Sequence, residues 1–238
     1  MGASKSTNKR QDKEKSNIQK EAVLEAQSDP MTKNEIIELY SFESATCKIR
    51  FETFKEGKKV TCTGTGFFCE IHDKSIPFNK ALFTNNHVLN ENQIKINKQV
   101  EFEYLGKNMK IDITKDRKTF TNKKLDYTCI QILDTDNIEK FFSIDETIFK
   151  DKNSLINQDM FILQYPNGNL SFHVGKTIGI NNSRIEHNVP SKDGSSGSPL
   201  IKRYNMNLIV GIHFDALKKE SEESSLNEGK FNNEQKCN

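Results

Sequence analysis

The feature that most constrains the fold is a series of short stretches rich in β-branched and aromatic residues, which begins at Ala45. Turn residues such as Gly57, Gly106 and the pair Asn167-Gly168 separate these stretches. We expect strands over residues 45–51, 60–71, 81–84, 99–105, 109–113, 128–133, 160–165, 171–179, 200–203 and 208–214. A short helix is expected only near residues 34–40. Many short strands with few helices predict an all-β barrel or sandwich.

Both ends of the chain differ in composition from the part that carries the strands. Residues 1–30 are rich in Lys, Glu, Ser and Asn, so they cannot bury enough apolar surface to offset the entropy cost of folding. Residues 217–238 are again polar and charged. We therefore expect one folded unit over residues 31–216 between a disordered N-terminal tail and a polar C-terminal tail, the latter with a degenerate strand as an alternative.

Composition limits the classes of function. The net charge of +2 is too small to indicate a nucleic-acid partner. No apolar run is long enough for a membrane-spanning helix, and the charged N-terminus predicts no secretory signal. The five cysteines are odd in number and match no zinc-binding spacing. We therefore expect free thiols in a reducing, cytoplasmic compartment, with no metal site and no cofactor.

Three local patterns bring a histidine, an aspartate and a serine together in that order along the chain. His87 ends an apolar run, Asp126 precedes a predicted strand, and Ser196 lies in the glycine-flanked turn 193–199. Taken alone, each pattern is typical of a packed histidine, a capping aspartate or an ordinary loop. Together on an all-β pattern they predict a nucleophile, a general base and an orienting acid.

These motifs resemble those of the trypsin-like, chymotrypsin-fold serine peptidases. The matching segments are Gly64–Phe67, Thr84–Val88, Asp126 with its strand, and Gly194–Pro199, within residues 45–214. The chain looks most similar to the disulfide-free branches: Deg-type proteases, glutamyl endopeptidases and intracellular eukaryotic trypsin-like peptidases.

The resemblance implies an all-β fold of two antiparallel, six-stranded Greek-key barrels. The first barrel would span about residues 45–135 and the second about residues 150–216. The active site would lie in the cleft between them.

The resemblance also implies a role for each matched residue. Ser196 would attack the scissile carbonyl, His87 would take its proton, and Asp126 would orient the imidazole. The backbone N–H groups of Gly194 and Ser196 would form the oxyanion hole. Ser195 is the other serine of the turn, but the family motif places the reactive serine directly before the glycine.

Two further residues resemble the pocket for the P1 side chain in glutamyl endopeptidases. They are His213, on the predicted strand 208–214, and Ser191, five residues before Ser196. Imidazole and hydroxyl groups can bind a carboxylate or an amide, so we expect a preference for Glu, then Gln or Asp. The alternative is that His213 is a strand residue without a pocket role. Asp215 departs from the family pattern and could repel an acidic substrate.

The N-terminus fits the pattern for N-myristoylation, with Gly2 after the first residue and Ser6 in the required place. Residues 5–20 carry a net charge of +4. One myristoyl chain and a basic segment together predict reversible binding to the cytoplasmic face of a membrane. The alternative is a solubilising tail.

The predicted function is therefore a cytoplasmic serine endopeptidase that acts on protein or peptide substrates. Two alternatives from other classes remain. One is a catalytically silent pseudoprotease that binds peptides, and the other is a structural scaffold in which the order of the three motifs is a coincidence.

Overall fold

The computed structural model describes residues 30–214. Its helical elements are α2 (Lys33–Ser41) and the 3-10 helices η1 (Phe42–Ala45), η2 (Asp134–Asp136), η3 (Glu146–Phe149), η4 (Lys152–Leu155) and η5 (Pro166–Gly168). The strands are β1 (Thr46–Lys55), β2 (Lys58–Glu70), β3 (Lys80–Thr84), β4 (Gln99–Tyr104), β5 (Lys107–Asp112), β6 (Thr119–Asn122), β7 (Tyr127–Gln131), β8 (Phe142–Ile144), β9 (Asp159–Gln164), β10 (Ser171–Asn181), β11 (Arg184–His187), β12 (Pro199–Lys202) and β13 (Leu208–Ile212).

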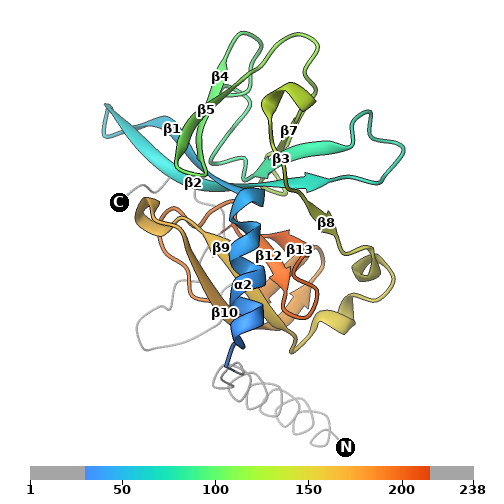
Figure 1. Cartoon of the computed structure of the whole chain (residues 1–238). Helices are drawn as coiled ribbons and strands as arrows, with labels where there is room; N and C mark the ends of the chain where they lie inside the picture. Colours follow the sequence, from blue (N-terminus) through green and yellow to red (C-terminus); the bar gives the residue numbers. More distant parts are fainter. Residues whose placement is uncertain (1–29, 215–238) are drawn as a thin grey trace, which may run out of the picture.

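The strands form two groups, which occupy the upper and lower halves of Figure 1. The first group has the antiparallel order β5-β4-β1-β2-β3-β7-β6. The second has the order β11-β10-β9-β12-β13-β8, in which β8 runs parallel to β13. Strand β8 also pairs in parallel with β2, so hydrogen bonds join both groups into one mixed sheet of 13 strands.

This architecture confirms the predicted all-β class. The separation into two groups is consistent with the two expected barrels, but the strand pairing differs in detail. The first group contains seven strands, β1 to β7, rather than six, and β8 introduces parallel pairs. Both parallel pairs are only two residues long, and so short a contact leaves little trace in a sequence pattern.

Each group has apolar residues at its centre. In the first group, Ile49, Phe68, Leu82 and Ile130 are all inaccessible to solvent. Strand β4 alternates exposed and buried residues because one of its faces meets water, as a period of two requires. In the second group every residue of β9 is buried, so no alternation appears there.

Helix α2 is fastened to the second group of strands, in front of which it runs in Figure 1. Its N-terminus is closed by a capping box between Thr32 and Glu35. The guanidinium of Arg203, which is 3% exposed, forms ion pairs with Glu35 at 2.8 Å and with Asp159 at 2.9 Å. Leu39, one turn further along the same face of the helix, is fully buried. This contact positions the segment that leads into β1.

The cysteine prediction is confirmed in part. Cys47, Cys69 and Cys129 are free and buried, and burial raises the pKa of the Cys129 thiol to about 11. Such thiols are inert packing groups rather than nucleophiles. Cys62 is also buried, but it is disulfide-bonded, so the expectation of a free thiol is wrong at that position.

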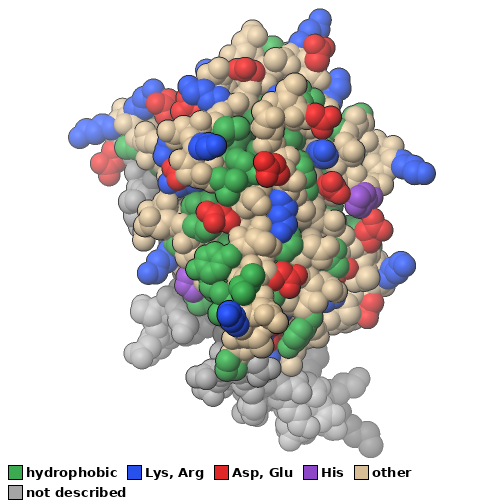
Figure 2. All heavy atoms as spheres, in the orientation of Figure 1, with side chains coloured by type: hydrophobic (Ala, Val, Ile, Leu, Met, Phe, Trp, Pro, Cys, Tyr) green, Lys and Arg blue, Asp and Glu red, His purple; other side chains and the backbone are tan. Residues whose placement is uncertain are grey.

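The surface carries both signs of charge. On the face shown in Figure 2, Lys and Arg side chains are interspersed with Asp and Glu. None of the helices within residues 30–214 combines the length and apolar character needed to cross a bilayer.

Candidate active site

The structure holds His87 and Asp126 in direct contact through two atoms of one carboxylate. The backbone N–H of His87 donates to Asp126 Oδ1 at 3.0 Å, and the ring Nδ1 lies 2.7 Å from Oδ2. A carboxylate only accepts, so Nδ1 carries the ring proton and Nε2 is the basic nitrogen. The His87 side chain is 36% exposed and that of Asp126 is 15% exposed. The ring is therefore fixed in orientation while one edge faces outward.

Asn85, which the sequence argument did not single out, supports this contact. Asp126 adopts a left-handed backbone conformation with φ of 53°, which is uncommon outside glycine. The buried side chain of Asn85 donates from Nδ2 to the Asp126 carbonyl at 2.8 Å. The backbone carbonyl of Asn85 accepts from the N–H groups of Val88 and Leu89, which closes the turn around His87. Its position two residues before His87 was the signal available in the sequence.

The turn that contains Ser196 is built around two glycines with positive φ, Gly194 at 94° and Gly197 at 89°. A Cβ at Gly194 would collide with the Tyr165 carbonyl oxygen, and one at Gly197 would collide with the carbonyl oxygen of Thr65. Both positions therefore require glycine for conformation and for space.

The two serines of the turn have different surroundings. Ser195 is 1% exposed, and its Oγ accepts from the Lys192 N–H at 3.0 Å. Its carbonyl accepts from the N–H and the Oγ of Ser198, at 3.1 and 2.6 Å. Ser196 is half-buried instead. The Ser195 hydroxyl thus holds the turn, while Ser196 is the more exposed of the two residues.

The backbone of the turn leaves two N–H groups without an acceptor in the described part of the chain. The Ser195 N–H donates to the Lys192 carbonyl at 3.0 Å, which closes a four-residue turn with Gly194 in third place. A φ of 94° at that place is typical of a type II turn, whereas a type I turn has a negative value there. Within residues 30–214, neither the N–H of Gly194 nor that of Ser196 donates a hydrogen bond. Two unused donors two positions apart in such a turn can bind one anionic oxygen.

Strand β2 brings the histidine and the serine segments together. The Thr65 N–H donates to the Ser196 carbonyl at 2.8 Å. A Cβ at Gly64 would lie 2.7 Å from a methyl group of Val88 and 3.4 Å from the Ser196 carbonyl oxygen. Glycine at this position therefore lets the residue after His87 approach the Ser196 turn closely. The predicted triad residues come from both strand groups, as the family resemblance implied.

His213 is the next predicted residue, and the structure gives it a partner that the sequence did not indicate. It is 5% exposed, and its Nδ1 lies 3.2 Å from Nε2 of His187. Burial, with a smaller effect of the nearby rings of His187 and His87, lowers the pKa of His213 to about 3. Burial also lowers the pKa of His187 to about 4. Both rings are therefore neutral at neutral pH.

The backbone places His213 against the nucleophile turn. Its N–H donates to the Ser198 carbonyl at 2.9 Å, and its carbonyl accepts from the Gly197 N–H at 2.9 Å. Ser191 is half-buried at the start of the same loop. Asp215 and Gly2 lie outside the described residues.

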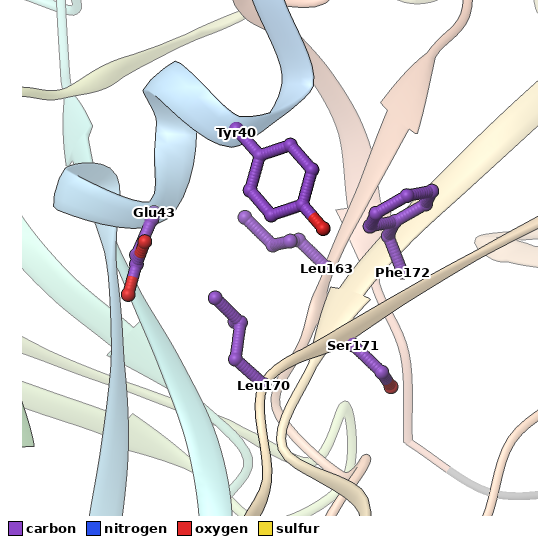
Figure 3. A pocket seen from close by; sticks show the side chains of 6 residues that line it. All are labelled: Tyr40, Glu43, Leu163, Leu170, Ser171 and Phe172. Carbon is purple, nitrogen blue, oxygen red and sulfur yellow. The ribbon is translucent and has the colours of Figure 1, made fainter. Parts of the chain in front are cut away.

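A cavity of about 240 Å³ lies elsewhere, between the α2–η1 segment and the second strand group (Figure 3). Its walls are Tyr40, Glu43, Leu163, Leu170, Ser171 and Phe172. None of the candidate site residues lines it. Within residues 30–214, no group of His, Cys, Asp and Glu has the arrangement needed to hold a metal ion.

Comparisons with known proteins show what this chain and its fold are similar to. The family model described as a trypsin-like peptidase domain matches residues 64–212. The solved structure described as the Rv3671c protease in its inactive form has 17% identity and a TM-score of 0.53, covering 80% of this chain and 87% of that one. The structure of Deg5 has 15% identity and a TM-score of 0.55, covering 79% and 88%. At such identities the two structures establish the shared chymotrypsin-like fold. No curated protein sequence matched the chain.

Proposed function

The chain belongs to the trypsin-like peptidase family, and from this premise we propose that it is a serine endopeptidase with His87, Asp126 and Ser196 as its catalytic triad. Ser196 Oγ attacks the scissile carbonyl while His87 Nε2 takes its proton. The same proton then passes to the leaving amine, and an acyl-enzyme remains. Water, deprotonated by His87, releases the acyl group and restores the serine.

The remaining groups stabilise the charges that develop during these steps. Asp126 holds the Nδ1–H tautomer and stabilises the imidazolium. The N–H groups of Gly194 and Ser196 bind the oxyanion of the tetrahedral intermediate, and a donor of this kind is worth about 100-fold to 1000-fold in rate. No metal or cofactor is needed for this chemistry.

The observation that carries the proposal is the contact of one Asp126 carboxylate with both the backbone N–H and the ring Nδ1 of His87. The test is labelling of the folded protein with a fluorophosphonate probe, followed by peptide mapping. We expect one adduct, on Ser196, and none in Ser196→Ala or in heat-denatured wild type. A folded wild type that takes no label, with its fold verified by circular dichroism, would instead support the alternative of a catalytically silent peptide-binding module.

We also propose that the P1 pocket prefers Glu, then Gln or Asp, with Ser191 and His213 as its polar groups. The Val189 N–H lies 3.3 Å from His187 Nδ1 and donates to it, so His187 carries its proton on Nε2. That proton is donated to His213 Nδ1, which leaves the His213 proton on Nε2. His213 then offers one neutral N–H donor, which suits a side-chain oxygen acceptor.

Cleavage of a peptide library tests this preference. We expect most cuts after Glu, and a loss of the preference in His213→Leu, where the ring is replaced by an apolar side chain. Leu170→Val, in the wall of the separate cavity, is the matched control and should keep the wild-type preference. Cuts mainly after Lys, Arg or large apolar residues would rule out the assignment.

The proposed substrates are proteins or peptides, without a role for nucleic acid. From the sequence alone we further propose a cytoplasmic protein that is held reversibly on a membrane face by myristoylated Gly2 and the basic segment 5–20. Mass spectrometry of the native N-terminus tests this. A myristoyl mass that is lost in Gly2→Ala is expected, and a free or acetylated terminus would exclude the anchor.

A further inference from the structure

Thr65 is a fully buried residue of β2 that contacts the nucleophile turn through its backbone and its side chain. Its N–H donates to the Ser196 carbonyl at 2.8 Å. Its Oγ1 donates to the Gly194 carbonyl at 2.8 Å and accepts from the Tyr165 N–H at 3.0 Å. The hydroxyl uses its single proton toward the turn and a lone pair toward the end of β9. One side-chain oxygen thus joins two loops of the second strand group to a strand of the first.

The Tyr165 segment holds the turn at a second point. Two residues later, the Asn167 N–H donates to the Asp193 carbonyl at 2.9 Å. In a trans peptide the C=O and the next N–H point in opposite directions. Because Asp193 O is held on the Asn167 side, the Gly194 N–H points to the other side, away from Asn167.

Gly194 is therefore fixed through both of its peptide groups. The Asp193–Gly194 peptide is held by the Asn167 N–H, and the Gly194–Ser195 peptide is held by the Thr65 hydroxyl. A change from a type II to a type I turn would rotate the Asp193–Gly194 peptide by about half a turn and direct its N–H inward. That rotation would remove one of the two oxyanion donors.

We propose that the Thr65 hydroxyl is a positioning group that keeps the turn in its oxyanion-binding form. This inference rests on the proposed serine-peptidase function. The hydroxyl sets the separation between the Tyr165–Asn167 segment and Gly194. It therefore acts on the reacting atoms indirectly, through the shape of the turn. It touches neither the substrate nor the nucleophile, so it is not a catalytic residue.

Two substitutions at Thr65 separate the hydroxyl from the shape of the side chain. Thr65→Val keeps the branched shape and removes the hydroxyl, whereas Thr65→Ser keeps the hydroxyl and removes a methyl group. Thr46→Val is the matched control, because Thr46 is a fully buried strand threonine whose Oγ1 donates to the Glu43 carbonyl at 3.0 Å and which contacts the side chain of Tyr165 rather than its N–H. All three are compared with wild type for kcat, KM and thermal unfolding on a peptide ester.

We expect kcat of Thr65→Val to fall by about 100-fold, the loss typical of a reacting group displaced by about 1 Å. KM should change little, because the donors act on the transition state rather than on bound substrate. Thr65→Ser should recover most of the rate, and Thr46→Val should keep it. A peptide boronic acid, which mimics the tetrahedral intermediate, should lose affinity for Thr65→Val by a similar factor.

The outcomes keep this inference separate from the function on which it rests. An inactive wild type, without label on Ser196, contradicts the proposed function itself. An active wild type with unchanged kcat in folded Thr65→Val overturns only the role of the hydroxyl. If Thr65→Val does not fold, Thr65→Ser decides: a kcat and boronate affinity near wild type support the role, and a 100-fold loss despite the retained hydroxyl refutes it.

Discussion

Replacement of Asp126 by asparagine probes the contact on which the proposed mechanism depends. In wild type the carboxylate accepts from the backbone N–H of His87 at 3.0 Å and from ring Nδ1 at 2.7 Å. An asparagine has only one oxygen, and the backbone N–H can only donate. The amide oxygen must therefore face that N–H, which places the amide NH₂ group against Nδ1.

The consequence is a change of tautomer. Since the amide NH₂ only donates, His87 Nδ1 becomes an acceptor and the ring proton moves to Nε2. His87 can then no longer take the proton of Ser196. The expected loss in kcat is about 10,000-fold, the size found for this substitution in a serine-protease triad. At about 1.4 kcal/mol for each factor of ten, this loss corresponds to about 5 kcal/mol in activation free energy.

The assay combines kinetics with a direct view of the tautomer. Peptide hydrolysis gives kcat, and nitrogen NMR of the imidazole reports which ring nitrogen carries the proton. Asp112→Asn is the matched control, because Asp112 is an exposed carboxylate that accepts from the Gln99 side chain at 2.7 Å, a bond that an amide oxygen can keep. A loss below 10-fold in Asp126→Asn, or a ring that keeps its proton on Nδ1, would rule out this role of the Asp126 carboxylate.

Three further predictions concern stability. Gly197→Ala should lower the free energy of unfolding by at least about 2 kcal/mol in urea titration, because φ is positive and the new Cβ meets the Thr65 carbonyl; an unchanged midpoint would contradict this. The pKa values of about 3 for His213 and about 4 for His187 lie below the value near 6.5 that a histidine has in the unfolded chain. The free energy of unfolding should therefore be highest above about pH 6.5 and decrease as the pH falls toward about 4, because the unfolded chain binds protons first. In His213→Gln the free energy of unfolding should depend less on pH, and an equal slope in the variant and in wild type would argue against a buried neutral His213. Arg203→Met should cost about 3 kcal/mol because the Glu35 and Asp159 carboxylates lose a buried partner, while Lys176 still pairs with Asp159 at 2.9 Å; a thermal midpoint equal to that of wild type would disprove that account.

Much of the fold follows from local sequence patterns. The predicted helix near residues 34–40 and all ten predicted strands correspond to observed elements, because each carries an apolar pattern or is bounded by turn residues. Strands β6, β8 and β11 were missed. Each is only three or four residues long, and β8 exists as a strand because it pairs with β2 and β13, which are distant in sequence.

Some residues of the candidate site can likewise be found from local sequence motifs, and others only from contacts made on folding. The residue types and their order identify His87, Asp126 and Ser196 as candidates, since each lies in a short motif with its own local signature. His187 and Thr65 carry no such signature. They matter through contacts with residues 26 and 129 positions away, the ring of His213 and the carbonyl of Gly194.

The all-β class, the peptidase family and the chemical types present at the candidate site follow from local sequence, because these depend on periodicity and on short motifs. The folded structure was needed to show which groups act on one another. It joined the two strand groups through β8, placed one Asp126 carboxylate on two atoms of His87, and paired His213 with His187 in a buried, neutral state. Hydrogen-bond direction, burial and the resulting pKa values depend on groups that lie far apart along the chain and meet only when it folds.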